Sequence, residues 1–202
     1  PHVAKLFAIL GEKELRFVDQ EHIQIIYYQD DLYPNRLKNY LDSPLLMYYK
    51  GTSDLNQEKI IAVVGTRKVT EYGKKLIQQL IEGILDLKLL VVSGLAYGVD
   101  SLVHKKCVDE NIETLGILGH GLDRMYPEVN THLSKQMQMH GGLLTEFGMG
   151  TKPDRENFPK RNRIVAGMSD AILVIETLRE GGSMITASYA NQYNKDVFAF
   201  PG

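Results

Sequence analysis

Twelve residues, K-P-D-R-E-N-F-P-K-R-N-R at 152–163, form the most basic stretch of the chain. The stretch contains five cations and two acids, and the aromatic Phe158 lies among them. Cations neutralise the phosphates of a nucleic acid, and an aromatic ring stacks on an unpaired base with about 1–3 kcal/mol per base. The stretch therefore predicts contact with a single strand, although a charge run is more often a solvated face. The predicted contacts here are Lys152, Phe158, Lys160, Arg161 and Asn162; the other two cations are Arg155 and Arg163.

An apolar run, IIAVV at 60–64, leads directly into Gly65, Thr66 and Arg67. A short unbroken apolar run is typical of a strand that is buried on both faces. The glycine allows a tight turn. Backbone N–H groups and the guanidinium can then bind a phosphate, because a guanidinium matches phosphate with two parallel hydrogen bonds. The simpler interpretation is a tight turn with an exposed arginine.

The segment SGLAYGVD at 93–100 repeats the pattern after a second apolar run. Gly94 and Gly98 let the backbone approach a ligand closely, next to Ser93. Asp100 begins a predicted helix, where it is a plain N-cap, a ligand contact, or both. Because the spacing is not that of a G-x-G-x-x-G motif, we expect no nicotinamide or flavin cofactor.

Two more glycine-containing segments follow predicted strands. The first, GHGLDRMYPEVN at 119–130, supplies Gly119, Gly121 and Arg124 as predicted contacts, and His120 as a weaker candidate for a ligand or proton carrier. The second, ETLREGGSMITA at 176–187, places glycines and a serine at a helix start, where exposed N–H groups favour an anion. The alternative there is a glycine-rich connection with a serine cap. Its predicted contacts are Gly182, Ser183 and Thr186.

The sequence shows no pattern typical of a catalytic or metal site. There are no paired carboxylates, no Ser/His/Asp arrangement and no P-loop. The six histidines and the single cysteine, Cys107, lie at no metal-ligand spacing. We therefore expect no enzymatic activity, no metal and no cofactor, and we interpret Cys107 as a packing residue within a helix.

These segments lie between predicted strands and helices that alternate along the chain. Such an alternation predicts an α/β fold: an extended Rossmann-like, doubly wound and mainly parallel sheet with helices on both faces. Right-handed crossovers then place the carboxyl ends of the strands, and the loops above, at one edge. The expected helices are 71–87 with Thr70 as N-cap, 100–110, 130–139, 161–167 and 183–193. The expected strands begin at 60, 89, 114, 143, 171 and 197.

The N-terminal quarter contains few glycine-containing segments of the phosphate-binding kind. We expect one or two helical pieces in 1–20, strands at 23–28 and 45–51, and a short helix at 35–41. The sequence thus divides into a lead-in, 1–55, packed on a Rossmann-like core, 56–202, which carries the predicted nucleic-acid contacts.

Bulk composition narrows the class of protein. The 202 residues carry 44% hydrophobic and 24% charged side chains, as in ordinary globular proteins. No apolar run approaches the roughly 18 residues of a membrane span, and no signal-peptide pattern is present, so we expect a cytoplasmic protein. The net charge of −2 argues against coating a polyanion with the whole surface, but it allows a local basic cleft.

Taken together, the motifs resemble the DNA-processing protein A family, DprA, also called Smf. The resemblance runs from about residue 20 to 202 and rests on VVGTR, SGLAYGVDSLVH, LGHGLDRMYPEVN, GLLTEFGMGTKP, FPKRNRIVAGMSDAILVIE, GGSMITA and VFAFPG, in this order. It implies a dimeric protein of natural transformation that binds and protects single-stranded DNA and helps load the RecA recombinase. By motif, Arg67 is implied as a main phosphate contact. It also implies dimer contacts beyond Gly202, so this stretch alone is expected to dimerise weakly.

Two alternatives stay open. One is a nucleotide-processing enzyme of the phosphoribohydrolase group, whose P-G-G-x-G-T-x-x-E signature here reads R-E-G-G-S-M-I-T-A without the glutamate. The other is a small-nucleotide sensor.

Overall fold

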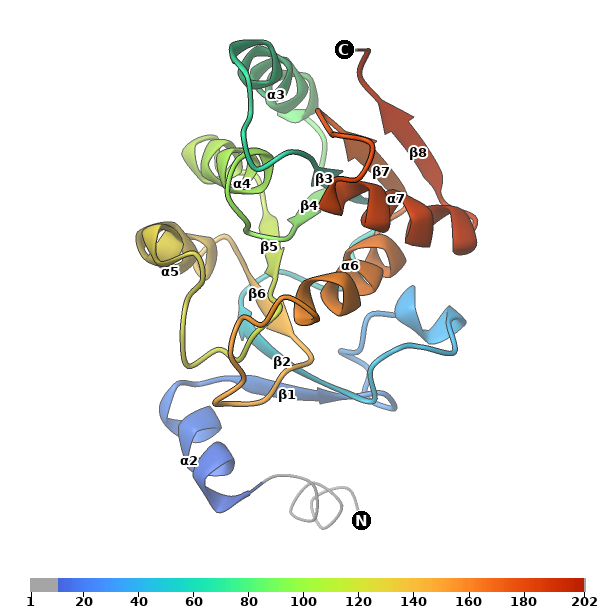
Figure 1. Cartoon of the computed structure of the whole chain (residues 1–202). Coiled ribbons are helices and arrows are strands. Elements are labelled where there is room, and N and C mark those ends of the chain that lie inside the picture. The colour runs from blue at the N-terminus through green and yellow to red at the C-terminus, as the bar shows by residue number, and fades with distance from the viewer. Residues whose placement is uncertain (1–10, 202) are drawn as a thin grey trace.

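The computed structural model describes residues 11–201, which form one eight-stranded sheet. The strand order is β1-β2-β6-β5-β4-β3-β7-β8; the six strands β3 to β8 are parallel, whereas β1 and β2 are antiparallel (Figure 1). The strands are β1 (Gln24–Tyr27), β2 (Leu46–Gly51), β3 (Ile60–Val64), β4 (Leu90–Ser93), β5 (Thr114–Ile117), β6 (Gly141–Thr145), β7 (Ala171–Val174) and β8 (Asp196–Ala199).

Helices cover both faces of this sheet. Helices α3, α4 and α5 lie on one face, and α6 and α7 pack against each other on the opposite face (Figure 1). The helices are α2 (Glu12–Gln20), α3 (Glu71–Ile84), α4 (Val99–Asp109), α5 (Thr131–Met137), α6 (Asn157–Met168) and α7 (Gly182–Gln192), with short 3-10 helices η1 (Leu37–Asn39) and η2 (Glu128–Asn130).

Strand β3 lies at the centre of the parallel part of the sheet and shows why its sequence is unbroken and apolar. Ala62 and Val64 join the core beneath α6 and α7, whereas Val63 joins the core beneath α3 and α4. All three side chains are buried. A strand that feeds two cores has no solvent-facing side, so alternation with polar residues disappears.

Strand β3 also marks the point where the chain reverses its direction across the sheet. From β3 the chain steps outward through β4, β5 and β6, and it then crosses back so that β7 pairs with the other side of β3. In open α/β sheets the carboxyl ends of the strands at such a switch point form a crevice that binds ligands. The loops after β3 and β7 therefore frame the first place to search for a site.

Most of the expected elements are confirmed, and the α/β sheet with helices on both faces is as expected. Thr70 caps α3 by accepting a hydrogen bond from Gly73 N at 3.1 Å. Helix α3 ends at Ile84 rather than 87, and the short helix expected at 35–41 is the 3-10 helix η1. The helical pieces expected in 1–20 are represented by α2; residues 1–10 lie outside the described part.

Two local expectations are wrong. Helix α6 begins at Asn157 rather than 161, so Phe158 and Lys160 belong to a helix and not to a basic loop. Asp100 is not an N-cap, because α4 begins one residue earlier and its N-cap is Gly98, at φ 82°. Both differences alter where charged side chains point at the carboxyl edge of the sheet.

Candidate functional site

A cavity of about 410 Å³ opens at the carboxyl ends of β3 and β7. Its walls are the loop after β3, the loop after β4, the first turns of α6 and the segment that leads into α7. The predicted contacts that line it are Gly65, Thr66, Arg67, Gly94, Asp100, Phe158, Arg161, Asn162, Gly182, Ser183 and Thr186. The geometry thus brings together eleven predicted residues from four separate segments.

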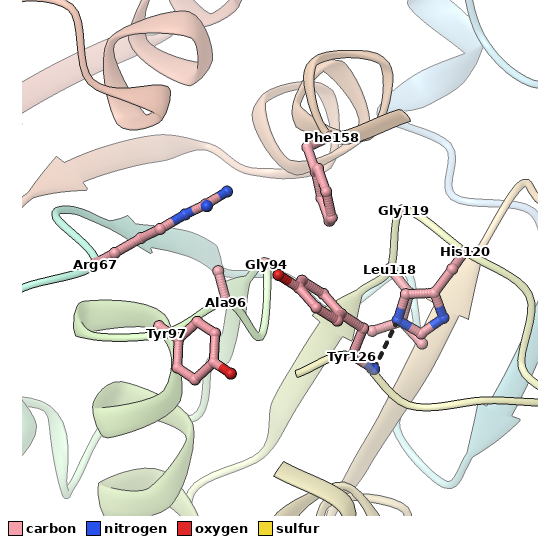
Figure 2. A pocket seen from close by; sticks show the side chains of 9 residues that line it. All are labelled: Arg67, Gly94, Ala96, Tyr97, Leu118, Gly119, His120, Tyr126 and Phe158. Atoms are coloured by element: carbon pink, nitrogen blue, oxygen red, sulfur yellow. Dashed lines mark hydrogen bonds between the residues drawn. The ribbon is translucent and has the colours of Figure 1, made fainter. Parts of the chain in front are cut away.

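Arg67 lies at the rim of this cavity and also borders a second, smaller hollow (Figure 2). Its side chain is exposed, and no carboxylate among residues 11–201 pairs with it. The guanidinium carbon lies 5.8 Å from the centroid of the Phe158 ring, a cation–π distance. Arg67 therefore keeps its donors free for an anion.

Main-chain contacts fix the loop that carries Arg67. Thr66 N donates to Glu176 O at 2.7 Å, and Val99 N donates to Thr66 O at 3.1 Å. A Cβ on Gly98 would clash with the Thr66 carbonyl and the Arg67 backbone. Glycine at this position is required by this close approach as well as by its positive φ.

Arg161 has a different role from the one its sequence context suggests. It is 4% exposed, and its Nη1 donates to the carbonyl oxygens of Gly94 and Ile117, at the ends of β4 and β5. Burial lowers the pKa of Arg161 to about 10, although the charge of Asp100 opposes that shift. A Cβ on Gly94 would overlap this guanidinium, so the glycine leaves the space that Arg161 fills.

Asp100 braces the loop after β4. Its Oδ2 accepts hydrogen bonds from Gly94 N at 3.1 Å and from Ala96 N at 3.4 Å. Burial raises the pKa of Asp100, and the charge of Arg161 is the largest influence that opposes the shift. Asp100 and Arg161 are thus buried opposite charges in the cavity wall that influence each other electrostatically, and each makes two hydrogen bonds to the backbone.

The first turn of α7 forms another wall. Ser183 Oγ donates to Thr177 Oγ1 at 2.6 Å, and Asn162 Nδ2 donates to Gly182 O at 3.2 Å, which ties α6 to α7. Thr186 is buried one turn further along. The N–H groups at the start of a helix carry partial positive charge, so this wall favours an anion in the same cavity that Arg67 borders.

Two more aromatic rings extend the site beyond Phe158, the one aromatic contact that the sequence predicted. The Phe158 ring centroid lies 5.9 Å from that of Tyr126, which lies 6.4 Å from that of Tyr97. Figure 2 shows these rings and Arg67 around one small hollow, which Gly119 also lines. Sequence reasoning missed Tyr97, Tyr126 and the exposed Lys68; aromatic or basic residues within glycine-containing loops at strand ends were the available signal.

Six predicted contacts line neither hollow: Ser93, Gly98, Gly121, Arg124, Lys152 and Lys160. Ser93 is buried and its hydroxyl donates to Val63 O at 2.6 Å, which holds β4 to β3. Arg124 pairs with Asp123 at 2.7 Å. A role for these six in binding stays a prediction.

Fewer cations of the basic stretch 152–163 are available to a ligand than its composition suggests. Of its five cations, Arg161 is buried and Arg163 pairs with Glu146. Burial raises the pKa of Glu146, and Arg163 opposes that shift. Lys152, Arg155 and Lys160 stay exposed and have no ion-pair partner among the described residues.

The remaining candidates are structural. His120 is buried; its Nδ1 donates to Gly121 O at 2.9 Å and its Nε2 accepts from Tyr126 N at 3.3 Å. These bonds use both ring nitrogens of a neutral imidazole, and burial lowers its pKa. Cys107 is buried with a pKa raised to about 12 by burial, as expected of a packing thiol. No group of three or more His, Cys, Asp or Glu side chains within 11–201 could hold a metal.

Comparison with known proteins assigns the family. Over residues 24–202 the chain matches the family described as DNA recombination-mediator protein A. The chain belongs to this family. It is 38% identical to protein Smf of Synechocystis sp. over 186 residues, which cover 90% of this chain and 47% of Smf. The chain therefore spans about half the length of this relative.

Solved structures of DNA processing protein A share this fold. The X-ray structure of the Streptococcus pneumoniae protein matches with a TM-score of 0.87 and 35% identity, over 98% of this chain and 70% of that one. The Helicobacter pylori protein, solved for its single-stranded DNA binding mode, matches with a TM-score of 0.81 and 27% identity, over 90% and 83%. The Rossmann-like fold expected of the recombination-mediator family is thereby confirmed.

Proposed function

We propose that this protein binds single-stranded DNA along the carboxyl edge of its sheet, with Arg67 as a principal phosphate contact. One observation carries the proposal: Arg67 is an exposed cation without a carboxylate partner in the described chain, set between a switch-point cavity and a group of aromatic rings. Family membership supports it, as does the single-stranded DNA binding of the Helicobacter pylori relative.

The chemistry of the cavity suits a phosphodiester. Arg67 and Lys68 supply positive charge at the rim, and the start of α7 supplies oriented N–H groups. Asp100 is the one carboxylate in the cavity wall, and it already accepts from two backbone N–H groups. A phosphate therefore meets donors on several sides without a free carboxylate to repel it.

We further propose that the bound strand is the substrate of a recombination mediator, which protects incoming DNA during natural transformation and helps load RecA onto it. The family description supports this role. We propose a homodimer in the cytoplasm as the working form, as the family resemblance of the motifs implies. Filament assembly by RecA on protein-coated single strands should accelerate when the full-length protein is added; an unchanged rate counts against this partner.

The enzyme alternative, a phosphoribohydrolase-like nucleotide hydrolase, receives little support from the described residues. Glu176, which ends the β7 segment, accepts hydrogen bonds from the backbone N and hydroxyl of Thr70, and Asp100 is buried and braced. Neither carboxylate is free to act as a base, so we propose a binding protein rather than an enzyme.

A paired experiment separates these alternatives. Single-stranded oligonucleotides should raise the melting temperature, since a ligand that binds only the folded state stabilises it. Nucleoside monophosphates should raise it far less and should release no base on chromatography. Stabilisation by mononucleotides but not by oligonucleotides favours a nucleotide sensor, and release of base at enzymatic rates favours the hydrolase.

A further inference from the structure

Glu176 follows strand β7 and contacts both ends of the loop that carries Arg67. Its main-chain oxygen accepts from Thr66 N at 2.7 Å. Its carboxylate accepts from the N–H of Thr70 at 2.9 Å and also from the Thr70 hydroxyl. We infer that Glu176 is a positioning residue that fixes Arg67 for phosphate binding. This inference rests on the proposed function and extends it from the residues that contact a phosphate to one that does not.

Strand pairing brings Glu176 to this loop. Strands β3 and β7 are parallel neighbours, with Val64 opposite Val174. The hydrogen bonds continue past the ends of both strands, because Ile175 N donates to Val64 O at 3.1 Å and Thr66 N donates to Glu176 O. The first end of the loop is therefore held by the main chain, and a substitution of the side chain at position 176 leaves that bond in place.

The second end of the loop depends on the carboxylate. Thr70 is the N-cap of α3, and its hydroxyl accepts from Gly73 N at 3.1 Å while it donates to Glu176. A Cβ on Gly73 would overlap Glu176 Oε2, so this glycine leaves the space that the carboxylate fills. A negative charge is also stabilised at the N-terminus of a helix. Without the carboxylate, the second end of the loop loses both of these contacts with the segment after β7.

The carboxylate acts from outside the phosphate cavity. Glu176 lines a separate cavity of about 380 Å³ and is not part of the wall of the switch-point cavity. Thr66 and Lys68 line both cavities, so the loop lies between them. Both carboxylate oxygens already accept hydrogen bonds, and no cation in the described part of the chain forms an ion pair with Glu176. Glu176 therefore influences a bound phosphate through the loop.

The sign of the effect on binding separates positioning from charge. A carboxylate near the site repels a phosphate, so its removal strengthens DNA binding if charge is its only influence. Loss of positioning weakens binding instead, because Arg67 must then be ordered when the strand binds. Glu176→Gln removes the charge, keeps the size of the side chain, and replaces one accepting oxygen by an amide nitrogen that can only donate.

Titration of a single-stranded oligonucleotide at about 50 mM salt, where phosphate contacts contribute strongly, provides the test. Glu176→Gln should lower affinity by roughly 2- to 150-fold, the range for residues coupled through a shared backbone segment, and by no more than Arg67→Ala. In the Arg67→Ala background the same substitution should cost less affinity, because a missing side chain cannot be misplaced. Tighter binding by Glu176→Gln, or an equal loss in both backgrounds, overturns the inference.

Two sets of variants serve as controls. Glu180→Gln removes the same charge from an exposed position in the loop between β7 and α7, and it should not lower affinity. Thr70→Ser keeps both donors to the carboxylate and should bind like the wild type, whereas Thr70→Val loses the hydroxyl and should bind more weakly. Melting temperatures show which variants are folded, and the Thr70 pair decides the question if Glu176→Gln is not. Equal losses in Glu180→Gln and Glu176→Gln, or equal affinities of the Thr70 pair, overturn the inference.

Amide hydrogen exchange separates this inference from the proposed function, because it needs no DNA. Peptides that span residues 65–70 should exchange faster in Glu176→Gln than in the wild type, since the loop opens more often without the carboxylate. Unchanged exchange overturns the positioning role whatever the DNA affinities are. Faster exchange in the variant, together with a wild type that binds no single strand, overturns the proposed function and leaves Glu176 as a structural contact of the loop.

Discussion

Removal of the Arg67 side chain tests the phosphate contact with little risk to the fold. The side chain is exposed and has no ion-pair partner in the described chain, and the loop around it is held by main-chain bonds of Thr66. Arg67→Ala gives up only the cation–π contact with Phe158, worth about 0.5–1 kcal/mol at an exposed site. We therefore expect a melting temperature close to that of the wild type.

The effect on binding should be much larger. A hydrogen bond to a charged group contributes about 1.5–3 kcal/mol, which corresponds to roughly 10- to 150-fold in affinity. The loss should be alike for all DNA sequences, because a phosphate contact reads no base. For single strands the slope of log affinity against log salt changes by about 0.7 for each phosphate neutralised, so the slope of the Arg67→Ala variant should be shallower by about that amount.

Fluorescence anisotropy of a labelled oligonucleotide at several salt concentrations measures both quantities. Lys88→Ala is a matched control, because Lys88 is exposed and precedes β4 at the opposite edge of the sheet. It removes the same charge and should leave affinity nearly unchanged. Full affinity in Arg67→Ala, an unchanged salt slope, or an equal loss in both variants would refute the reasoning.

Three further perturbations follow from the described contacts. Gly98→Ala should destabilise the fold and weaken binding, because the added Cβ would clash with the Thr66 carbonyl. Gly150 is also at positive φ but has open space around it, so Gly150→Ala should lower the free energy of unfolding in urea by only about 1–2 kcal/mol. Equal losses of unfolding free energy in the two variants would contradict the clash. Arg161→Met should lower the free energy of unfolding by about 3–5 kcal/mol, because buried Asp100 loses the opposing charge near it and two strand-end carbonyls lose their donor. It should weaken DNA binding without changing the salt slope; a shallower slope would instead make Arg161 a phosphate contact. Burial lowers the pKa of His104 from 6.5 to about 3, so below pH 6.5 the unfolded chain binds a proton that the folded chain does not. The free energy of unfolding should therefore fall by about 1.4 kcal/mol for each pH unit below 6.5. Urea titrations at several pH values should show a weaker pH dependence for His104→Gln, and an unaltered dependence would exclude His104 as its source.

The sequence carries most of the information about the sheet and the crevice. Strand β3 is apolar throughout because both of its faces are covered, and periodicity reveals that directly. The expected positions of Gly65, Arg67 and Ser183 at one cavity follow from parallel strands that end at one edge. Local patterning therefore suffices for residues whose position depends on strand direction alone.

The start of α6 shows where local patterning fails. The sequence predicts this helix at 161–167, but it begins at Asn157 and holds Pro159 in its first turn, where proline is tolerated because its missing N–H is not needed. Once Phe158 and Arg161 belong to a helix, they lie three residues apart on one face, and both border the cavity although Arg161 is buried. The boundary of the helix thus decided which cations are exposed.

The burial of Arg161 and the contact between the rings of Tyr97 and Tyr126 could not be predicted from the sequence. Arg161 is buried because Gly94, 67 positions away, leaves room for its guanidinium and because two strand-end carbonyls accept its hydrogens. Tyr97 and Tyr126 meet because β4 and β5 are neighbours in the sheet. Such contacts depend on the strand order and on backbone spacing, which no single motif specifies.

Comparison of single-stranded and double-stranded DNA tests the central claim most directly. An oligonucleotide and its duplex are titrated at about 50 and 200 mM salt, a range over which phosphate-dependent binding changes strongly. The account predicts tighter binding of the single strand at both concentrations and a steep loss of affinity at the higher one. Equal affinity for the duplex, or binding that does not respond to salt, would contradict a site built from Arg67, the start of α7 and exposed aromatic rings.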